Sequence, residues 1–278
     1  MVLIADAGST KTNWLLISKN KAITPLKSQG LNPVIISKTE INQRLSIVFR
    51  DLTSATEVEK VHFFGAGCWN EANCSIIRIA LKKYFPNAII EVASDILGAV
   101  RASCGDQVGI VCILGTGSNT CLFDGKEVRY GVPSLGYILG DEGSGMYLGK
   151  QLIQHYFYQK LPKDLHQFFY DTYGLNKAQL IQRVYREEGA NQYLASFVPF
   201  LAKHRQHPFI QQLLNQVFNQ FIDRHILKYP EHKILPIHFI GSIAFHFKSE
   251  LAACLVEKGL QLGKIIKHPI EALQVYFE

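Results

Sequence analysis

The sequence predicts an α/β protein made of two related domains. Its 278 residues are enough for about two domains of roughly 150 residues each. Apolar strand-like runs alternate with segments in which apolar residues recur at helical spacing. A strand, a Gly/Ser/Thr turn and a return strand also occur twice, around Gly8-Ser9 and again around Gly117-Ser118, 109 positions later. A repeat of that length is too long for a solenoid and indicates a duplicated domain.

The first half is expected to begin with a β-hairpin and to continue as alternating helices and strands. The expected elements are a strand over residues 2–5, a strand over 14–17, a helix over 37–52, a strand over 61–64, a helix over 76–85, a strand over 89–92 and a helix that begins just after Asp95. The first two strands flank a glycine turn, which is typical of a hairpin. The helix over 37–52 places Ile41, Leu45 and Phe49 at helical spacing. Pro25 is expected in a turn.

The second half repeats the hairpin and then becomes largely helical. The expected elements are a strand over residues 109–114, a turn over 115–119, a strand over 120–123, helices over 149–229, a strand over 236–240 and one helix over 242–255 that Gly259 ends. Within the helical part, residues 212–226 carry a broad apolar stripe, which is typical of a helix that faces a core.

The composition excludes several classes of protein. With 47% hydrophobic residues the chain is not disordered, and no apolar run approaches the ~18 residues of a membrane span. The six cysteines form no C-x-x-C pair, and so few in a chain of this length fit a reducing cytosol. The excess of 29 basic over 23 acidic residues is mild. We expect a cytoplasmic protein without a nucleic-acid or membrane partner, and a homodimer is one candidate for its oligomeric state.

The two glycine turns are the candidate phosphate sites. Neither the G-x-x-x-x-G-K-[ST] motif nor a G-x-G-x-x-G motif after a strand occurs in the sequence, which excludes P-loop and Rossmann sites. Glycines let a backbone approach a phosphate, and exposed N–H groups and hydroxyls can donate to its oxygens. One such turn commonly serves only to reverse the chain, but two turns in equivalent positions favour phosphate binding.

Acidic residues stand beside these turns. Asp6 ends the first strand and could hold Mg²⁺ through water or cap a turn. Asp95 follows the strand over 89–92 and could be a helix cap or a catalytic base. Asp141 and Glu142 lie among three glycines, a pattern that favours close approach of a ligand over a solvated surface.

Four segments, in this order, resemble a known superfamily. They are Asp6-x-Gly8-x-Thr10-Lys11-Thr12, Leu114-Gly115-Thr116-Gly117-Ser118-Asn119, Gly140-Asp141-Glu142-Gly143-Ser144 and Ile240-Gly241-Ser242. They resemble the phosphate-1, phosphate-2 and adenosine motifs of the sugar kinase/Hsp70/actin superfamily. Within it the chain is similar to N-acetylglucosamine kinase and the BadF/BadG/BcrA/BcrD ATPase family. The resemblance implies two duplicated ribonuclease H-like domains of the actin/hexokinase type around a nucleotide cleft. The first would span residues 1–106, joined by a helix over 269–278, and the second 107–268, with a helical insertion over 149–230.

The resemblance also implies a role for each matching residue. ATP would be bound by Gly8, Ser9, Thr10, Lys11, Gly115, Thr116, Gly117, Ser118, Gly241 and Ser242, and Mg²⁺ by Asp6. Asp95 matches the family's catalytic aspartate, which accepts the proton of the attacking sugar hydroxyl. The sugar would be bound by Asn32, Asp95, Thr116 and Asp141.

The expected function is an ATP- and Mg²⁺-dependent kinase that phosphorylates an amino sugar, first of all N-acetylglucosamine at its 6-hydroxyl. Leu135 and Tyr137 replace a tryptophan and a histidine of the animal enzymes' pattern, so N-acetylmuramic acid, glucosamine and other hexoses stay open. Two alternatives are an iron–sulfur ATPase activator of an acyl-CoA dehydratase or reductase and a sugar-binding regulator without turnover. Cys112 and Cys121 are expected to be buried in strands, which disfavours a cluster between two subunits.

Overall fold

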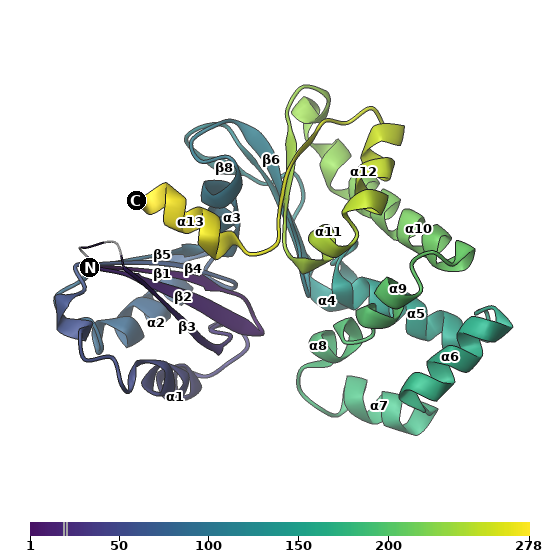
Figure 1. Cartoon of the computed structure of the whole chain (residues 1–278), viewed down its shortest axis with the longest axis horizontal. Coiled ribbons are helices and arrows are strands. Elements are labelled where there is room, and N and C mark those ends of the chain that lie inside the picture. Colours follow the sequence, from purple (N-terminus) through teal and green to yellow (C-terminus); the bar gives the residue numbers. More distant parts are fainter. Residues whose placement is uncertain (19, 21) are drawn as a thin grey trace. The chain divides into compact units, whose positions relative to one another are not determined.

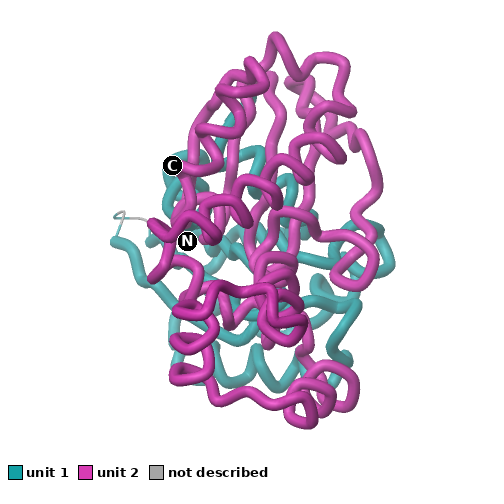
Figure 2. Tube along the Cα trace, turned by 90° about the vertical axis from the view of Figure 1, so that its right-hand side faces the viewer, with its two compact units in different colours: residues 1–106, 268–278 teal, residues 107–267 magenta. Residues whose placement is uncertain are grey.

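The computed structural model describes residues 1–18, 20 and 22–278. The chain forms two compact units (Figure 2). Unit 1 contains Met1–Asp106 and His268–Glu278, and unit 2 contains Gln107–Lys267. Unit 1 is therefore built from two separate stretches of the chain.

The centre of unit 1 is a five-stranded mixed sheet. Its strands are β1 (Val2–Ala7), β2 (Lys11–Ile17), β3 (Ile23–Gln29), β4 (Lys60–Gly65) and β5 (Ile89–Ser94), in the spatial order β3-β2-β1-β4-β5. Strand β2 is antiparallel to both β1 and β3, whereas β1, β4 and β5 are parallel. The carboxyl ends of β1, β4 and β5 consequently meet at one edge of the sheet.

Helices cover both faces of this sheet (Figure 1). Helices α1 (Lys38–Phe49) and α2 (Glu71–Lys82) lie on one face, and α3 (Asp95–Ser103) and α13 (Pro269–Phe277) on the other. A short 3-10 helix, η1, spans Ala55–Glu57. The core under α1 and α2 is aromatic: the Phe49 ring lies 5.0 Å from that of Trp14 and 4.8 Å from that of Phe85. Burial of such rings supplies a large part of the unit's stability.

Two sequence predictions for unit 1 are wrong in detail. Pro25 lies within strand β3 and pairs with Leu15, whereas we expected a turn there. Proline lacks an N–H, and it is tolerated because β3 is an edge strand. Helix α2 begins at Glu71, before the expected start at residue 76, because the Asn70 side chain caps it by accepting a hydrogen bond from the Asn73 N–H (2.8 Å).

Unit 2 repeats the sheet of unit 1. Its strands are β6 (Gly109–Leu114), β7 (Ser118–Phe123), β8 (Val128–Arg129), β9 (Ile237–Ile240) and β10 (Leu262–Ile266), in the order β10-β9-β6-β7-β8. Counted within each unit, both sheets have the order 3-2-1-4-5 or its reverse, with the same parallel and antiparallel pairs. The predicted duplication is confirmed.

Between β8 and β9 the chain of unit 2 is helical. The helices are α4 (Gly136–Leu139), α5 (Gly145–Phe157), α6 (Lys163–Tyr173), α7 (Lys177–Tyr185), α8 (Ala190–Ala195), α9 (Val198–Lys203), α10 (Pro208–Arg224), η2 (Ile226–Lys228) and η3 (Pro230–Lys233). The predicted apolar stripe lies on α10, and its members Leu214, Phe218 and Phe221 are fully buried. Its assignment to the core is confirmed.

The single helix predicted over 242–255 is wrong. The structure has two helices there, α11 (Ser242–His246) and α12 (Lys248–Glu257), separated by Phe247. Phe247 leaves the helical conformation (φ −108°, ψ 31°) and its side chain is completely buried. We attribute the break to this burial, because in a continuous helix the side chain at position 247 would point in a direction set by the helical periodicity and not into the core. Gly259 ends α12 in a left-handed conformation (φ +65°), as predicted.

Helix α13 closes the second face of the unit 1 sheet with aromatic contacts. Phe277 stacks on His62 of β4 with ring centroids 4.0 Å apart and an interplanar angle of 18°. The Arg101 guanidinium of α3 lies 5.2 Å from the centre of the Tyr276 ring. These contacts attach the last helix of the chain to the first unit.

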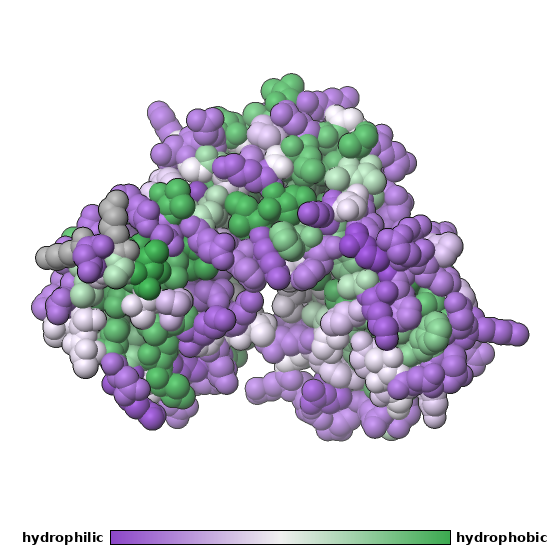
Figure 3. Space-filling model, in the orientation of Figure 1, coloured by the Kyte–Doolittle hydropathy of each residue, from purple (hydrophilic) through white to green (hydrophobic). Residues whose placement is uncertain are grey.

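The surface carries polar and apolar residues together. On the face drawn in Figure 3, hydrophobic side chains are interspersed with hydrophilic ones in both units. Among the described residues, none of the helices combines the length and the apolar character that crossing a membrane requires.

Candidate active site

The catalytic candidate of unit 1 is at the carboxyl edge of its sheet. Asp95 follows β5 and is the first residue of α3. Ser94, and not Asp95, caps this helix, because its Oγ accepts a hydrogen bond from the Leu97 N–H (3.4 Å). The Asp95 carboxylate is held by the Ile96 N–H, 2.9 Å from Oδ1. The cap role that the sequence left open therefore belongs to Ser94, and the carboxylate of Asp95 is available for chemistry.

Burial is the main cause of the raised pKa of Asp95. It outweighs the hydrogen bonds from backbone N–H groups, which favour the charged form, and raises the pKa to about 6. An aspartate with a pKa near neutrality is a stronger base than an ordinary one and is still mostly ionised at pH 7. Perturbed carboxylates of this kind are typical of catalytic sites.

Asp6 lies at the same edge, at the end of β1. Strand β4 separates β1 from β5, so the two aspartates stand two strand spacings apart, about 10 Å along the sheet. Burial is the largest cause that raises the pKa of Asp6 to about 6, and the Asp95 carboxylate raises it further. The Asn13 side chain donates a hydrogen bond to Asp6, and Lys11 is close enough to lower the pKa. Sequence analysis did not single out Asn13; its place opposite Asp6 in the hairpin register is the signal that could have identified it.

The turn over residues 8–11 links β1 to β2. It is closed by a hydrogen bond from the Gly8 N–H to the Lys11 carbonyl oxygen (2.9 Å). Thr10 and Lys11 are exposed and Ser9 is partly buried. The Gly30 N–H donates to the Thr10 carbonyl oxygen (3.0 Å), which attaches the end of β3 to this turn. Asn32 contacts the same turn, since its Nδ2 donates to Ser9 Oγ (2.9 Å).

In unit 2, the turn over residues 115–118 packs against the start of α5. The Gly145 N–H donates to the Gly115 carbonyl oxygen (2.8 Å), and the Met146 N–H donates to the Thr116 carbonyl oxygen (3.1 Å). The carbonyl groups of the turn therefore satisfy two N–H groups at the start of this helix. Ser144 caps the helix by accepting from the Tyr147 N–H (3.1 Å).

The two neighbouring acids of unit 2 have different environments. Asp141 Oδ1 accepts a hydrogen bond from the Ser118 N–H (3.0 Å), and Asp141 is in the left-handed region (φ 59°), an unusual conformation for a residue other than glycine. Burial raises the pKa of Asp141, with Glu142 adding to the shift. Glu142 is paired with Arg224 and with His225 Nε2 (3.0 Å). Burial alone would raise its pKa, but these hydrogen bonds hold it below its usual value.

This pairing assigns Glu142 to the attachment of the 140–144 segment to α10. The sequence suggested that both acids lie close to a ligand, whereas in the structure Glu142 forms an ion pair with Arg224 and Asp141 does not. Sequence spacing alone does not reveal an ion pair across 82 positions.

Gly241 and Ser242 lie beside the turn over 115–118. Gly241 follows β9, which is parallel to β6, and it has a φ of +118° that only glycine adopts readily. A Cβ atom at Gly241 would lie 2.4 Å from the Leu114 carbonyl oxygen. Ser242 begins α11 and is exposed. Three predicted motifs of unit 2 thus meet at the carboxyl edge of β6 and β9.

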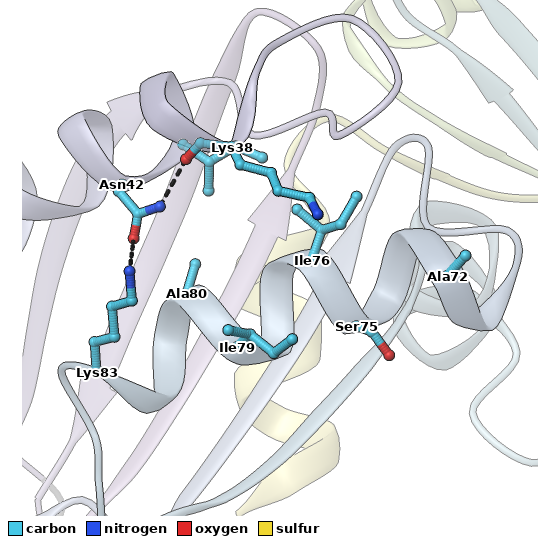
Figure 4. A pocket seen from close by; sticks show the side chains of 9 residues that line it. Lys38, Asn42, Ala72, Ser75, Ile76, Ile79, Ala80 and Lys83 are labelled. Atoms are coloured by element: carbon cyan, nitrogen blue, oxygen red, sulfur yellow. Dashed lines mark hydrogen bonds between the residues drawn. The ribbon is translucent and has the colours of Figure 1, made fainter.

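A separate hollow of about 370 Å³ lies between α1 and α2 (Figure 4). Lys83 donates to Asn42 Oδ1 (2.9 Å) and Asn42 donates to the Lys38 carbonyl oxygen (2.6 Å). None of the predicted site residues lines this hollow.

The comparisons with known proteins agree with this geometry. Scans against models of protein families and against curated proteins gave no match. A solved structure from Porphyromonas gingivalis, described as a "putative N-acetylglucosamine kinase", has 41% sequence identity and a TM-score of 0.93, with 99% of this chain and 98% of that chain covered. The chain belongs to the N-acetylglucosamine kinase-like family of sugar kinases.

Two more distant structures share the fold of this N-acetylglucosamine kinase-like chain. One, from Chromobacterium violaceum, bears the same description and has 17% identity, a TM-score of 0.72, and coverage of 100% of this chain and 98% of the other. The second is a ROK family glucokinase from Streptomyces griseus in complex with glucose and AMPPNP, with 13% identity, a TM-score of 0.58, and coverage of 99% and 97%. The two-domain actin/hexokinase-type fold is confirmed.

The residues of unit 1 fit a hydrated Mg²⁺ ion. The Asp95 carboxylate raises the pKa of Asp6, because both negative charges lie at one edge of the sheet, and a divalent cation would relieve that repulsion. No cluster of three or more potential metal ligands occurs among residues 1–18, 20 and 22–278. An ion held by one carboxylate through several waters, as Mg²⁺ commonly is, needs no such cluster.

Gly115 provides a first test of the candidate phosphate turn over residues 115–118. Its φ is not in the left-handed region and a Cβ atom there would meet nothing within 4 Å, so the fold does not require glycine. We expect Gly115→Ala to change the free energy of unfolding by no more than about 0.5 kcal/mol. If this turn binds the phosphates of ATP, the methyl group would occupy space that a phosphate oxygen needs, and the KM for ATP should rise about tenfold or more. Denaturant unfolding and steady-state kinetics measure the two effects; an unchanged KM would contradict phosphate contact at Gly115.

Proposed function

We propose that this sugar kinase transfers the γ-phosphoryl group of ATP to the 6-hydroxyl of an amino sugar, N-acetylglucosamine. The observation that carries the proposal is Asp95, a partly buried carboxylate at the carboxyl end of β5 with a pKa of about 6; Ser94, and not Asp95, caps α3. The description of the Porphyromonas gingivalis relative supports the choice of sugar.

Asp95 would act as the base. Its carboxylate would accept the proton of the sugar hydroxyl as that oxygen attacks the γ-phosphorus, and the Ile96 N–H would keep Oδ1 in place. Phosphoryl transfer depends mainly on positioning and on neutralising charge, so one well-placed carboxylate and two donor-rich turns suffice on the protein's side.

The other residues would bind the substrates. Mg²⁺, when bound with ATP, supplies the positive charge that neutralises the phosphate oxygens, and Asp6 would hold it through water. Donors for the phosphates would come from two turns, and contacts to the adenosine from the start of α11; these residues are Gly8, Ser9, Thr10, Lys11, Gly115, Thr116, Gly117, Ser118, Gly241 and Ser242. The sugar would be bound by Asn32, Thr116 and Asp141. A homodimer in the cytoplasm is part of the proposal, to be checked by light scattering and cell fractionation.

The pKa of Asp95 leads to a prediction for the pH profile. Because the base must be ionised, kcat/KM should fall about tenfold for each pH unit below about 6. Protonation of Asp6, which has a similar pKa, is expected to add to this fall. If the catalytic aspartate had its usual pKa, kcat/KM would stay unchanged down to about pH 4. A kcat/KM profile from pH 4.5 to 8 that stays flat to pH 4.5 would contradict the assignment.

The iron–sulfur activator is disfavoured. All six cysteines are buried, as predicted for Cys112 and Cys121, so the thiols do not offer an exposed set of cluster ligands. Desolvation raises the pKa of Cys112 well above its usual value, which further disfavours a thiolate there.

A coupled assay of ADP release over a panel of sugars tests the proposed function. The panel contains N-acetylglucosamine, glucosamine, N-acetylmuramic acid and glucose, with Mg²⁺ and ATP. N-acetylglucosamine is expected to give the highest kcat/KM, with the 6-phosphate as product by mass spectrometry and NMR. Tight binding of a sugar in calorimetry without any turnover would replace the kinase by the sugar-binding regulator.

A further inference from the structure

Asn32 joins two loops of unit 1. It follows β3, and its side chain donates from Nδ2 to Ser9 Oγ (2.9 Å) and accepts at Oδ1 from the Val34 N–H (3.0 Å). Ser9 belongs to the turn over residues 8–11, the candidate phosphate turn. A residue predicted to contact the sugar therefore touches a residue predicted to contact ATP.

Gly67 confines the Asn32 side chain. A Cβ atom at position 67 would lie 2.1 Å from Asn32 Oδ1, and Gly67 has a φ of +82°. The amide of Asn32 is thus enclosed between the turn over 8–11 and the loop after β4. Such a constrained amide has little freedom to move when a ligand binds.

The hydrogen-bond directions give this contact a chemical meaning. The Ser9 oxygen accepts from Asn32, so its own hydroxyl hydrogen remains a donor for a phosphate oxygen. An amide has two N–H groups and two lone pairs; the described contacts use one of each, and a sugar hydroxyl can both donate to and accept from the others. A hydrogen bond donated to Asn32 Oδ1 polarises the amide and strengthens the hydrogen bond that its N–H donates to Ser9 Oγ. The Ser9 hydroxyl in turn becomes a stronger donor toward a phosphate oxygen.

Unit 2 contains a corresponding contact. Asp141 is also predicted to bind the sugar. Its Oδ1 accepts a hydrogen bond from the Ser118 N–H of the second glycine turn (3.0 Å). A Cβ atom at Gly117 would lie 2.9 Å from Asp141 Oδ2. In each unit, a predicted sugar residue lies directly against the predicted phosphate turn of that unit.

We propose that Asn32 is a positioning residue that couples the binding of the sugar to the binding of the ATP phosphates by the turn over residues 8–11. The proposal rests on the proposed function. It states that sugar and nucleotide raise each other's affinity through the Asn32–Ser9 hydrogen bond. By linkage the two factors are equal, and couplings of this kind are typically about 5–150-fold.

Calorimetry on the full chain tests the coupling. The Kd of a non-hydrolysable ATP analogue with Mg²⁺ is measured with and without saturating N-acetylglucosamine. In the wild type the sugar should lower this Kd at least about fivefold. Ser9→Ala removes the hydroxyl that accepts the hydrogen bond from Asn32, while the Asn32 side chain itself is unchanged. The ratio of the two Kd values should therefore fall to near one. Ser9→Thr keeps the hydroxyl and should keep the ratio.

Ser28→Ala is the matched control. Ser28 Oγ accepts a hydrogen bond from Trp14 Nε1 (3.0 Å), so this variant also loses one side-chain hydrogen bond between neighbouring strands, yet should keep the wild-type ratio. A wild-type ratio of one, or a Ser9→Ala variant that weakens nucleotide binding equally with and without sugar, would overturn the coupling. If N-acetylglucosamine is still phosphorylated in that case, the proposed function stands; if no sugar is phosphorylated, both fail.

Discussion

Replacing Asp95 by asparagine is expected to lower kcat about 10²- to 10⁴-fold, the usual contribution of a general base. Asparagine has the same shape and its Oδ1 can still accept from the Ile96 N–H, 2.9 Å away in the wild type. What it cannot do is take the proton of the sugar hydroxyl. The KM values for sugar and ATP should change far less than kcat, as coupled ADP-release kinetics can measure.

The same substitution should stabilise the apo protein at neutral pH. The pKa of Asp95 is about 6 in the folded chain against an ordinary 3.8, so the folded state binds the proton more tightly than the unfolded state. Wild-type stability therefore falls as the pH rises from about 4 to about 6, by up to about 3 kcal/mol. Asparagine has no charge to bury, so Asp95→Asn should exceed the wild type by about 1–3 kcal/mol at pH 7 and by nearly nothing at pH 4.

Asp51→Asn serves as the control, because Asp51 is exposed on the same unit. It should leave both kcat and the free energy of unfolding close to wild type. Urea unfolding at pH 4 and pH 7 separates the outcomes. An Asp95→Asn variant with wild-type turnover would remove Asp95 from catalysis, and one that is less stable at pH 7 would assign it a structural role.

Gly241→Ala is expected to destabilise unit 2 strongly. Its backbone conformation (φ +118°, ψ 167°) costs a residue with a side chain about 1–3 kcal/mol. The new Cβ would also lie 2.4 Å from the Leu114 carbonyl oxygen, which is backbone and has little room to move. Such overpacking adds about 1–3 kcal/mol. The total is a large part of the 5–15 kcal/mol that typically stabilises a folded domain.

Gly259→Ala separates strain from collision. Gly259 also has a positive φ (+65°), but a Cβ atom there would meet nothing within 4 Å. It should cost about 1 kcal/mol, the usual penalty of a left-handed conformation. Thermal unfolding of both variants checks the difference. Equal losses for the two variants would show that the contact with Leu114 yields easily.

Much of the fold could be predicted because strands, turns and helices leave local signals in this chain. The repeated strand–turn–strand pattern at Gly8 and Gly117 indicated two related units, and both sheets indeed share one strand order. Strand β3 left no such signal, since Pro25 suggested a turn and only the edge position makes a proline acceptable there. The break at Phe247 depends on burial in the folded core, which spacing along a helix cannot reveal.

The sequence predicted which residues form the candidate site, but it predicted few of the contacts between them. Motif order identified Asp6, Asp95 and the glycine turns. Which residue caps α3 required coordinates, because Ser94 and Asp95 are adjacent and equally suitable caps. The Asn32–Ser9 hydrogen bond joins positions 23 residues apart through the arrival of β3 beside the first hairpin. Contacts of this kind depend on tertiary structure and leave no periodic pattern.

The return of α13 to the first unit has a consequence for how the protein is made. Residues 1–106 leave the ribosome early, but the part of the second sheet face that α13 covers, beside α3, stays exposed until residues 268–278 have been synthesised. In the meantime all of unit 2 emerges. Apolar surface exposed for that period is a target for chaperones and for aggregation. A nascent chain stalled before residue 268 should therefore bind chaperones more strongly than the released protein.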